Sequence, residues 1–321
     1  MTHTNVSANP VAGRQVATAF APASVGNVAV GFDVLGLSVQ AIGDRVTARR
    51  TAELGVKIAA IHGVVRDLPL DAERNTAGRA VMSIVEDQKL AYGIELTIEK
   101  GIPLGSGLGG SAASAVAAVV AANALLDQPL SQLELLKHAM RGEEVASGSV
   151  HVDNIAPSLF GGLVLTVGVD NPNVKQIPMP ANVRCVLVHP HMMLSTREAR
   201  KILKPTVSLS DVIWQTANLA GFLTGCFTGD LRLIGESLED VVIEPQRRVL
   251  IPGFDAVKQA AKDAGALGCS ISGAGPTVFA WLPADKATTA RDGMVAAFRA
   301  AGLGSDAWIS PLEPQGARLV D

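Results

Sequence analysis

A glycine-rich stretch ahead of an alanine-rich run restricts the fold of this chain more than any other sequence feature. Residues 103–114 are Pro-Leu-Gly-Ser-Gly-Leu-Gly-Gly-Ser-Ala-Ala-Ser, with four glycines between positions 105 and 110. Glycine tolerates positive φ and has no Cβ to obstruct a ligand. Ser111 stands at the expected N-cap of a helix over residues 112–126. Unpaired N–H groups and the helix dipole favour a phosphate there, and the alternative is a flexible turn before a buried helix.

Known phosphate-binding patterns match this stretch only in part. No Gly-Lys-Ser/Thr follows the glycines, which excludes a Walker A loop. Gly105, Gly107 and Gly110 satisfy the dinucleotide pattern G-x-G-x-x-G. That pattern requires a strand running directly into the first glycine and a second strand after the helix. Here residues 100–104 intervene and residues 131–146 predict another helix, so a dinucleotide site is disfavoured.

Composition narrows the class of protein. The 321 residues suffice for one large or two medium domains. A content of 48% hydrophobic and 18% charged residues predicts a folded globular chain. The net charge of −3 and the absence of a Lys/Arg run argue against a nucleic-acid partner. Residues 1–10 lack a signal-peptide core and residues 111–126 are too short to span a bilayer. We therefore expect a cytoplasmic protein without a membrane partner, with reduced thiols at its three cysteines, Cys185, Cys226 and Cys269.

The periodicity of apolar residues predicts a mixture of strands and helices along the chain. Strands are predicted over 15–20, 45–50, 55–61, 94–99, 163–169, 183–188, 267–270, 278–282 and 307–310. Helices are predicted over 77–89, 112–126, 131–146, 195–200, 210–228, 230–240, 254–264 and 286–301. Residues 170–181, rich in Asn and Pro, are the predicted linker between domains at 1–172 and 173–321.

Two segments carry polar residues among apolar neighbours. The predicted loop over residues 21–36 contains Asp33, a carboxylate that would be buried with nothing opposite it unless it contacts a ligand. The second segment is His151-Val-Asp-Asn154, which follows the end of a predicted helix. Glu143, near the end of that helix, is either a solvated acidic residue or part of a site. From the residues alone both interpretations stay open.

Several separated stretches together resemble one enzyme family. They are the loop at 21–36, the glycine loop at 103–114 and Ser-Gly-Ala-Gly-Pro-Thr at 272–277, in an order similar to that of the GHMP small-molecule kinases. Within these kinases, Gly-Asn-Val-Ala-Val-Gly-Phe-Asp, Gly-Ser-Val-His-Val-Asp-Asn-Ile-Ala-Pro and Glu-Pro-Gln-Arg resemble the homoserine kinases. The sequence departs from the family at Gly110, where a serine is usual, and at Gln246, where a tyrosine is common.

The resemblance implies an α+β fold with the two-domain GHMP kinase architecture. Residues 1–172 would form the ATP-binding domain, similar to domain 2 of a small-ribosomal-subunit protein and containing a left-handed βαβ crossover. Residues 173–321 would form a ferredoxin-like domain. ATP and the substrate would lie in the cleft between the two. The family also implies a homodimer.

The resemblance further implies a reaction and its residues. The γ-phosphoryl group of ATP would pass to the side-chain hydroxyl of L-homoserine, giving O-phosphohomoserine for threonine biosynthesis. The implied ATP contacts are Asn75, Pro103, Leu104, Gly105, Ser106, Gly107, Leu108, Gly109, Gly110, Ser111 and Ser114. The implied Mg²⁺ ligands are Ser111 and Glu143, which with Asp33 and Asn154 form the implied catalytic set. The implied substrate contacts are Asn27, Asp33, His151, Asp153, Thr196, Arg200 and Arg247.

Three questions stay open at this point. Arg248 is adjacent to Arg247, and either could bind the substrate carboxylate. Asn154 stands where mevalonate kinases place an aspartate base, which leaves no assigned general base. The chain could also phosphorylate another small alcohol, or bind nucleotide or amino acid without catalysis.

Overall fold

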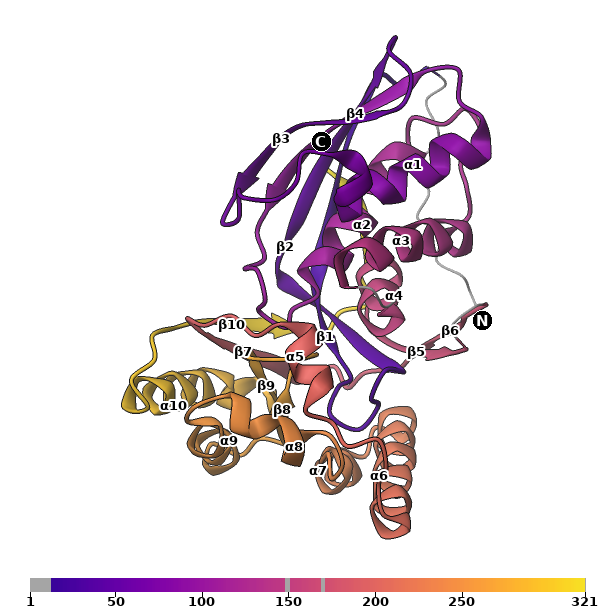
Figure 1. Cartoon of the computed structure of the whole chain (residues 1–321). Coiled ribbons are helices and arrows are strands. Elements are labelled where there is room, and N and C mark those ends of the chain that lie inside the picture. Colours follow the sequence, from indigo (N-terminus) through magenta and orange to yellow (C-terminus); the bar gives the residue numbers. More distant parts are fainter. Residues whose placement is uncertain (1–12, 148–150, 169–170, 321) are drawn as a thin grey trace.

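Two β-sheets organise the chain in a computed structural model that describes residues 13–147, 151–168 and 171–320. Figure 1 shows the larger sheet, built mainly from the first half of the chain, above the smaller sheet from the second half. Residues 148–150, the first three of the motif Gly-Ser-Val-His-Val-Asp-Asn-Ile-Ala-Pro, lie outside the described residues. The same holds for Asp170 of the predicted linker. None of the described helices combines the length and apolar character needed to cross a lipid bilayer.

The larger sheet has the strand order β11-β1-β2-β4-β3, with β5 paired to β2 and β6 paired to β5. Its one parallel pair among the described strands is β3 with β4, and the crossover between them contains η1 (Ala72–Arg74) and α1 (Thr76–Gln88). This is the βαβ unit that the prediction requires, and its hand stays a prediction. The strands are β1 (Val16–Gly26), β2 (Leu35–Thr51), β3 (Val56–Gly63), β4 (Gly93–Lys100), β5 (Leu163–Val167), β6 (Asn173–Ile177) and β11 (Arg318–Val320).

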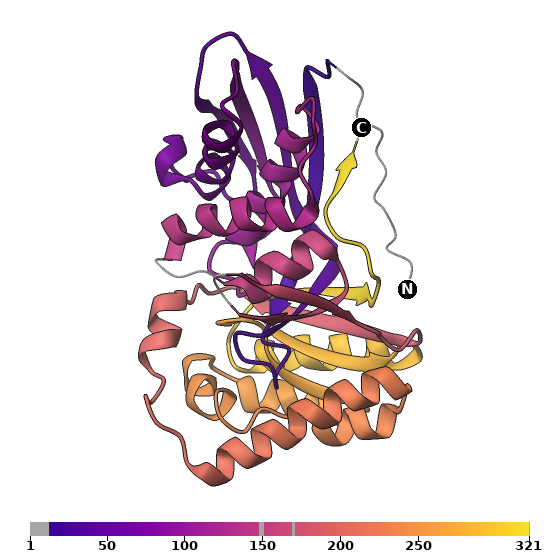
Figure 2. The ribbon, with the colours of Figure 1, turned by 90° about the vertical axis from the view of Figure 1, so that its right-hand side faces the viewer.

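Four helices pack on one face of this sheet, as the two views in Figures 1 and 2 show. They are α1, α2 (Gly110–Asn123), α3 (Gln132–Ser147) and α4 (Val152–Phe160). Helix α2 is buried along most of its length because small alanine side chains let it approach β1 and β2 closely. The glycine loop that precedes α2 therefore stands on a fixed support.

The smaller sheet is antiparallel, with the order β10-β7-β9-β8. One face packs against α9 (Phe254–Asp263) and α10 (Ala287–Ala300), and the other adds Leu187, Phe279 and Trp281 to the core of the larger sheet. This β-α-β-β-α-β sequence of elements is the one that a ferredoxin-like domain has. Its strands and remaining helices are β7 (Val183–Pro190), β8 (Gly268–Ile271), β9 (Val278–Pro283), β10 (Ser305–Pro311), α5 (Thr196–Lys201), α6 (Leu209–Thr228), α7 (Leu231–Ser237), α8 (Glu244–Arg247), η2 (Arg248–Leu250) and η3 (Ala284–Lys286).

Two local predictions in the first half of the chain are wrong. Strand β1 continues to Gly26, where a loop was expected from residue 21, because Ala21, Ala23 and Val25 pair with β2 and are fully buried. Helix α4 was not predicted, and Pro157 inside it explains why. Ser131 and Glu134 form a capping box at the start of α3, because the Glu134 carboxylate accepts the Ser131 N–H at 2.7 Å and Ser131 Oγ accepts the Glu134 N–H at 3.4 Å.

The region around the predicted domain boundary differs from a simple linker. Residues 173–177 form β6, which pairs with β5 as an edge strand of the larger sheet. The polar residues of this segment are compatible with a strand at the edge of a sheet. At the other end of the chain, β11 pairs with β1. The larger sheet therefore also takes strands from after residue 172, and the division at that residue stays a prediction.

Candidate functional site

A cavity of about 570 Å³ brings the predicted site residues together. Its walls come from the glycine loop, the ends of α1, α3 and α4, and segments of the second half around α5, α8 and residues 273–274. Leu108 is the exception among the predicted residues, because it points into the core and is fully buried. The predicted residues that line the cavity are Asn27, Asp33, Asn75, Pro103, Leu104, Gly105, Ser106, Gly107, Gly109, Gly110, Ser111, Ser114, Glu143, His151, Asp153, Asn154, Thr196, Arg200 and Arg247.

The glycine loop is held in shape by the 272–277 turn, although the two lie far apart in sequence. Ser272 Oγ donates to the carbonyl of Gly107 at 2.7 Å, and Thr277 Oγ1 donates to the carbonyl of Ser106 at 2.6 Å. Gly107 has φ 76° and a Cβ there would lie 2.5 Å from the Ser272 carbonyl oxygen. Only glycine fits this close approach, and the bonds use carbonyls rather than N–H groups of the loop.

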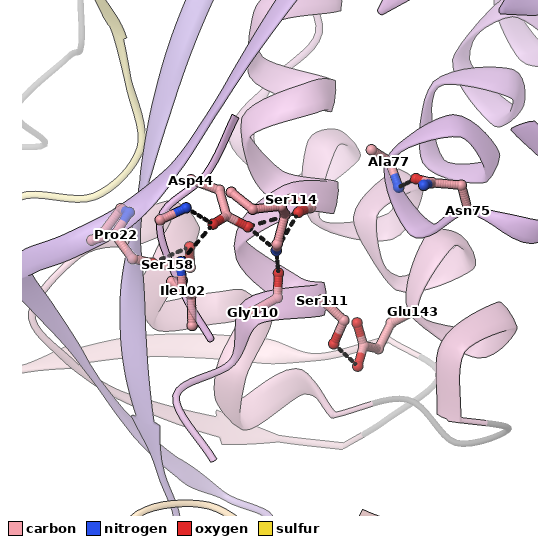
Figure 3. A network of polar contacts seen from close by, with 12 residues as sticks. Pro22, Asp44, Asn75, Ala77, Ile102, Gly110, Ser111, Ser114, Glu143 and Ser158 are labelled. Carbon is pink, nitrogen blue, oxygen red and sulfur yellow. Dashed lines mark hydrogen bonds and ion pairs between the residues drawn. The ribbon is translucent and has the colours of Figure 1, made fainter. Parts of the chain in front are cut away.

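The helix after the loop starts two residues earlier than predicted. Gly109 is the N-cap of α2 in a left-handed conformation, so Ser111 is not the cap but lies in the first turn. A glycine at the cap makes a serine cap unnecessary, and the Ser111 hydroxyl instead donates to Glu143 Oε1 at 2.8 Å, as Figure 3 shows. The start of α2 and the end of α3 therefore meet beside the loop. Glu143 is 3% exposed, whereas its neighbour Glu144 faces solvent.

His151 joins this acidic corner from the start of α4. Its Nδ1 lies 3.6 Å from Glu143 Oε1. Hydrogen bonding to Glu143 raises the pKa of His151, against the opposing effect of burial. Among the described residues, no three His, Cys, Asp or Glu side chains form a cluster that could hold a metal ion. A cation at this corner would thus need oxygen ligands beyond Ser111 and Glu143.

Sequence reasoning missed a buried ion pair beneath the loop. Lys100, at the end of β4, forms an ion pair with Asp44 and donates to the Gly110 carbonyl at 2.7 Å and to Ser114 Oγ at 2.8 Å. The second oxygen of Asp44 accepts the N–H groups of Gly101 and Ile102 at 3.0 and 3.2 Å. Figure 3 shows Asp44 and Ser114 in this network. The position of Lys100 shortly before the loop marks it as a basic residue near the site, but nothing in the sequence indicates its partner Asp44.

Asn75 occupies the N-cap of α1 on another wall of the cavity. Its Oδ1 accepts the N–H of Ala77 at 3.0 Å, and its Nδ2 donates to the Pro69 carbonyl at 2.9 Å. The cap holds the start of α1 against the cavity. Asn75 therefore has a local structural role in addition to lining the site.

The turn between β1 and β2 forms a further side of the cavity. Asn27 Nδ2 donates to the Gly273 carbonyl at 2.9 Å, and Asn27 Oδ1 accepts the N–H of Asp33 at 3.0 Å. The expectation that Asp33 is buried is wrong, because its side chain is 43% exposed. Its carboxylate accepts two hydrogen bonds from Arg200, of 2.8 and 3.0 Å. The partner that the sequence could not identify thus comes from α5, 167 residues away.

The two neighbouring arginines face different surroundings. Arg247 is 3% exposed, lines the cavity, and donates to the carbonyls of Ala199 and Gly273 at 3.0 and 3.1 Å. Burial, and then the positive charge of Arg200, lower the pKa of Arg247 to about 10, so it stays cationic at neutral pH. Arg248 instead forms an exposed ion pair with Asp255 at 2.8 Å. The geometry favours Arg247 as the cation of the site.

Asp153 and Asn154 project from the first turn of α4. The Asp153 carboxylate accepts the N–H of Asn27 at 3.2 Å. Burial, and then the negative charge of Asp33, raise the pKa of Asp153 to about 6. Asn154 Oδ1 accepts the Ser24 hydroxyl at 3.0 Å, which fixes the orientation of its amide. The buried Asp153 carboxylate therefore connects the start of α4 to the turn that carries Asp33.

The surroundings of the glycine loop contradict a dinucleotide site. The chain passes from α2 into α3 and α4, and the next strand, β5, is antiparallel to β2. Within the described residues, no strand parallel to β4 follows α2 to complete the required unit.

Comparison with known proteins agrees with this geometry. Residues 75–162 match the GHMP kinases N terminal domain, and residues 222–300 match the GHMP kinases C terminal domain. A homoserine kinase of Xylella fastidiosa (strain 9a5c) is 53% identical over 95% of this chain and 94% of its own length. The chain belongs to the homoserine kinase family. A homoserine kinase of Chlorobium phaeobacteroides (strain BS1) is 43% identical over 94% of this chain and 99% of its own.

The solved structures extend this family relation to the fold. The crystal structure of a homoserine kinase from Cytophaga hutchinsonii is 44% identical and has a TM-score of 0.93, over 98% of this chain and 100% of that one. A mevalonate kinase from L. major, solved with R-mevalonate, has a TM-score of 0.69 at 17% identity, which shows a shared fold alone. The two-domain GHMP kinase architecture is thereby confirmed.

Proposed function

We propose that this protein transfers the γ-phosphoryl group of ATP to the side-chain hydroxyl of L-homoserine, giving O-phosphohomoserine. The supporting observation is one cavity that joins a glycine loop at the start of a helix to Asp33, Arg200 and Arg247. The first fits the phosphates of ATP, and the second fits a zwitterion. The full-length identity to homoserine kinases supports this choice of substrate.

The ATP contacts follow from the walls of the cavity. The N–H groups of the glycine loop, together with the positive end of α2, bind the phosphates. Lys100 fixes the loop from below through the Gly110 carbonyl and Ser114. Asn75 at the start of α1 lies on the adenine side. This division assigns ATP to the part of the cavity formed by the larger sheet and its helices.

The homoserine contacts need a partner for each charged group of the substrate. Asp33, and behind it Asp153, supply negative charge for the ammonium group. Arg247 presents a guanidinium from a buried position and Arg200 a second from a half-exposed one, which suit a carboxylate. Thr196 and His151 complete the wall around the hydroxyl-bearing chain.

The transfer step depends on alignment and charge more than on a strong base. Phosphoryl transfer passes through a loose transition state with charge spread over the phosphoryl oxygens. Asn154 orients the attacking hydroxyl, since an amide cannot accept its proton. The oxygen of homoserine forms the new bond to phosphorus, the bond to the leaving phosphate of ATP breaks, and the proton passes to the transferred phosphoryl group.

Ser111 and Glu143 fit the Mg²⁺ that such a reaction uses. Both offer oxygen donors, which a hard cation prefers, and they already lie 2.8 Å apart beside the loop. Ser111 and Glu143 would hold the cation, which would supply positive charge to neutralise the phosphates of ATP. Without a cation, the Glu143 carboxylate would repel ATP.

Glu143→Gln tests this assignment because it keeps the size of the side chain and removes its charge. We expect kcat to fall by about 10²-fold and the Mg²⁺ concentration for half-maximal rate to rise, with little loss of fold stability. Glu144→Gln is the matched control and should titrate like wild type, since Glu144 faces solvent. A shifted Mg²⁺ curve for Glu144→Gln, or for neither variant, would contradict the assignment.

A coupled assay of ATP turnover tests the function itself. L-homoserine is compared with 4-hydroxybutanoate, which lacks the ammonium group, and with 3-aminopropan-1-ol, which lacks the carboxylate. A site built to pair both groups rejects such analogues by up to about 10⁴–10⁵ in kcat/KM. Comparable turnover of either analogue, or of butanol, would contradict the substrate assignment.

We also propose that two copies pair through α6, in the cytoplasm. Residues 212–228 of this helix contain no charged side chain, and Ile213, Trp214 and Phe227 are 60%, 63% and 64% exposed. Ala217 and Ala220 lie between these large residues on helical spacing. In an antiparallel pair of α6 helices, the large side chains near each end of one helix would pack against those of the other. The alanines of the two helices would meet in the middle. The cysteines of the described residues are free and buried, which fits a reducing compartment.

Sedimentation velocity decides the oligomeric state. Wild type should sediment as a dimer, and Trp214→Glu should sediment as a monomer, because it buries a charge at the interface. Arg232→Glu, on an exposed residue beyond the helix, is the control for surface charge. A monomeric wild type would end this proposal and leave the reaction assignment unaffected.

A further inference from the structure

The turn between β1 and β2, residues 27–34, has an unusual backbone and is called the substrate loop below. Asn27, Val28 and Ala29 have φ values of 68°, 44° and 58°, and Asp33 has 60°. Residues other than glycine rarely adopt this left-handed region, and a β-branched residue such as Val28 adopts it least. Such conformations persist where surrounding contacts hold them. The contacts that hold the substrate loop therefore determine where Asp33 lies.

One of these contacts comes from a residue outside the cavity wall. Gln215, on α6, donates from Nε2 to the Val30 carbonyl at 3.2 Å. Its Oε1 accepts the N–H of Val241 at 3.0 Å. Each end of the amide thus meets a backbone group of the opposite polarity, which fixes the orientation of the side chain. Gln215 therefore links the middle of the substrate loop, at Val30, to the segment around Val241 in the second half of the chain.

The segment at Val241 leads directly to Arg247. The Asp240 carboxylate accepts the N–H groups of Val242, Ile243 and Glu244 at 2.9, 2.9 and 2.8 Å. The N–H of Arg247 then bonds to the Ile243 carbonyl at 3.0 Å. These bonds make residues 240–247 one compact unit, so a displacement of Val241 is transmitted to Arg247.

We propose that Gln215 is a positioning residue for the homoserine pocket. It fixes the spacing between the substrate loop, which carries Asp33, and the 240–247 unit, which carries Arg247. Gln215 does not line the cavity and acts through these two segments. The inference rests on the proposed function, in which Asp33 and Arg247 bind the two charged ends of one amino acid.

Asn218 offers a matched control on the same helix. It lies three residues beyond Gln215, and its Nδ2 donates to the Glu239 carbonyl at 2.8 Å. Asn218 therefore anchors the chain next to the same 240–247 unit through a bond of the same kind. Among the described residues it makes no hydrogen bond to the substrate loop. A general effect on stability would appear in both positions, and an effect on spacing would appear at Gln215.

Steady-state kinetics with varied homoserine and varied ATP test the proposal. Gln215→Met keeps the size of the side chain and removes both hydrogen bonds. We expect it to raise KM for homoserine about tenfold, since two hydrogen bonds that hold the pocket are lost. KM for ATP should stay within about twofold, because the ATP wall does not contact Gln215. Asn218→Leu should leave both KM values within about twofold, with a melting temperature similar to that of Gln215→Met.

Gln215→Glu provides a second variant should Gln215→Met fail to fold. The carboxylate keeps the acceptor for Val241 but faces the Val30 carbonyl without a donor, so KM for homoserine should again rise. An unchanged KM in the Gln215 variants, or an equal rise in Asn218→Leu, would overturn the inference while homoserine turnover by wild type upheld the function. A wild type that does not phosphorylate homoserine would overturn both.

Discussion

Two ion pairs border the cavity, and they differ in how far water reaches them. The side chains of Lys100 and Asp44 are 5% and 0% exposed, and both take part in further hydrogen bonds beneath the glycine loop. The side chains of Arg200 and Asp33 are 42% and 43% exposed and pair with each other across the open part of the cavity. One pair is enclosed and fully engaged, and the other is accessible.

This difference separates two kinds of work. A buried charge pair is costly to disturb, because removing one partner strands the other without solvation. The Lys100–Asp44 pair therefore holds the glycine loop in a fixed shape. An exposed pair contributes little to stability, so its members can exchange each other for a ligand at small cost. This accessibility suits the proposed roles of Asp33 and Arg200 toward the ammonium and carboxylate groups of homoserine.

The largest expected effect comes from breaking the enclosed pair. Lys100→Met leaves the Asp44 carboxylate buried and uncompensated, and should lower the free energy of unfolding by about 3–5 kcal/mol. Chemical denaturation measures it. ATP affinity should fall in the same variant, because the Gly110 carbonyl and Ser114 lose their donor.

The exposed Arg141–Asp87 pair, with side chains 47% and 46% exposed, is the control for this variant. Arg141→Met should change the free energy of unfolding by less than about 1 kcal/mol. Equal losses in the two variants would remove the distinction between an enclosed structural pair and an exposed one.

The same contrast explains what the sequence could predict. The glycine loop, most helix limits and the meeting of Ser111 with Glu143 follow from signals within short stretches or between successive helices. The Asp44–Lys100 pair joins residues 56 positions apart on neighbouring strands, and no local pattern encodes it. The N-cap at Gly109 rather than Ser111 depends on a left-handed backbone at Gly109, which the preference for serine at N-caps does not indicate.

A similar limit applies to the homoserine side of the cavity. The resemblance to a family pointed to Asp33 and Arg200, and burial distinguishes Arg247 from Arg248 only in three dimensions. Gln215 carried no signal, because its two partners are backbone groups in distant segments. Residues that line the cavity were therefore predictable from motifs, whereas residues that hold those motifs together were not.

The arginines of the homoserine side give the next largest effect. Arg247→Leu should reduce kcat/KM for homoserine by a factor that corresponds to about 2–5 kcal/mol, with KM for ATP little changed. Arg200→Leu should act in the same direction while lowering the free energy of unfolding by less than about 1 kcal/mol, because its pair with Asp33 is half-exposed. Initial rates and denaturation of each variant separate the two quantities.

Arg248→Leu is the control, since Arg248 pairs with Asp255 away from the cavity. It should leave both KM values near those of wild type. If Arg248→Leu impairs homoserine use and Arg247→Leu does not, the choice between the two arginines is wrong. A large loss of stability in Arg200→Leu would instead mean that the accessible pair is structural.

Asp153 lies between the two extremes. It is buried like Asp44, but among the described residues it forms no ion pair with a lysine or arginine. Its pKa rises from 3.8 to about 6, mainly through burial and then through the charge of Asp33. Between these two pH values the folded protein binds more protons at Asp153 than the unfolded chain does. The contribution of Asp153 to stability therefore falls as pH rises through this window and is lost above about pH 6.

Asp153→Asn removes this titration and should raise the free energy of unfolding, whereas the substitutions above lower it or leave it little changed. At pH 8 the variant should be more stable than wild type by about 1–3 kcal/mol, and near pH 4 the two should agree. Denaturation at several pH values measures the difference. Asp87→Asn, on an exposed aspartate, should show no such gain at pH 8. If ionised Asp153 supplies part of the charge for the ammonium group, as proposed, the gain should come with weaker homoserine binding. A variant less stable than wild type at pH 8 would mean that Asp153 is a structural charge like Asp44, held in place for the fold rather than for the ligand.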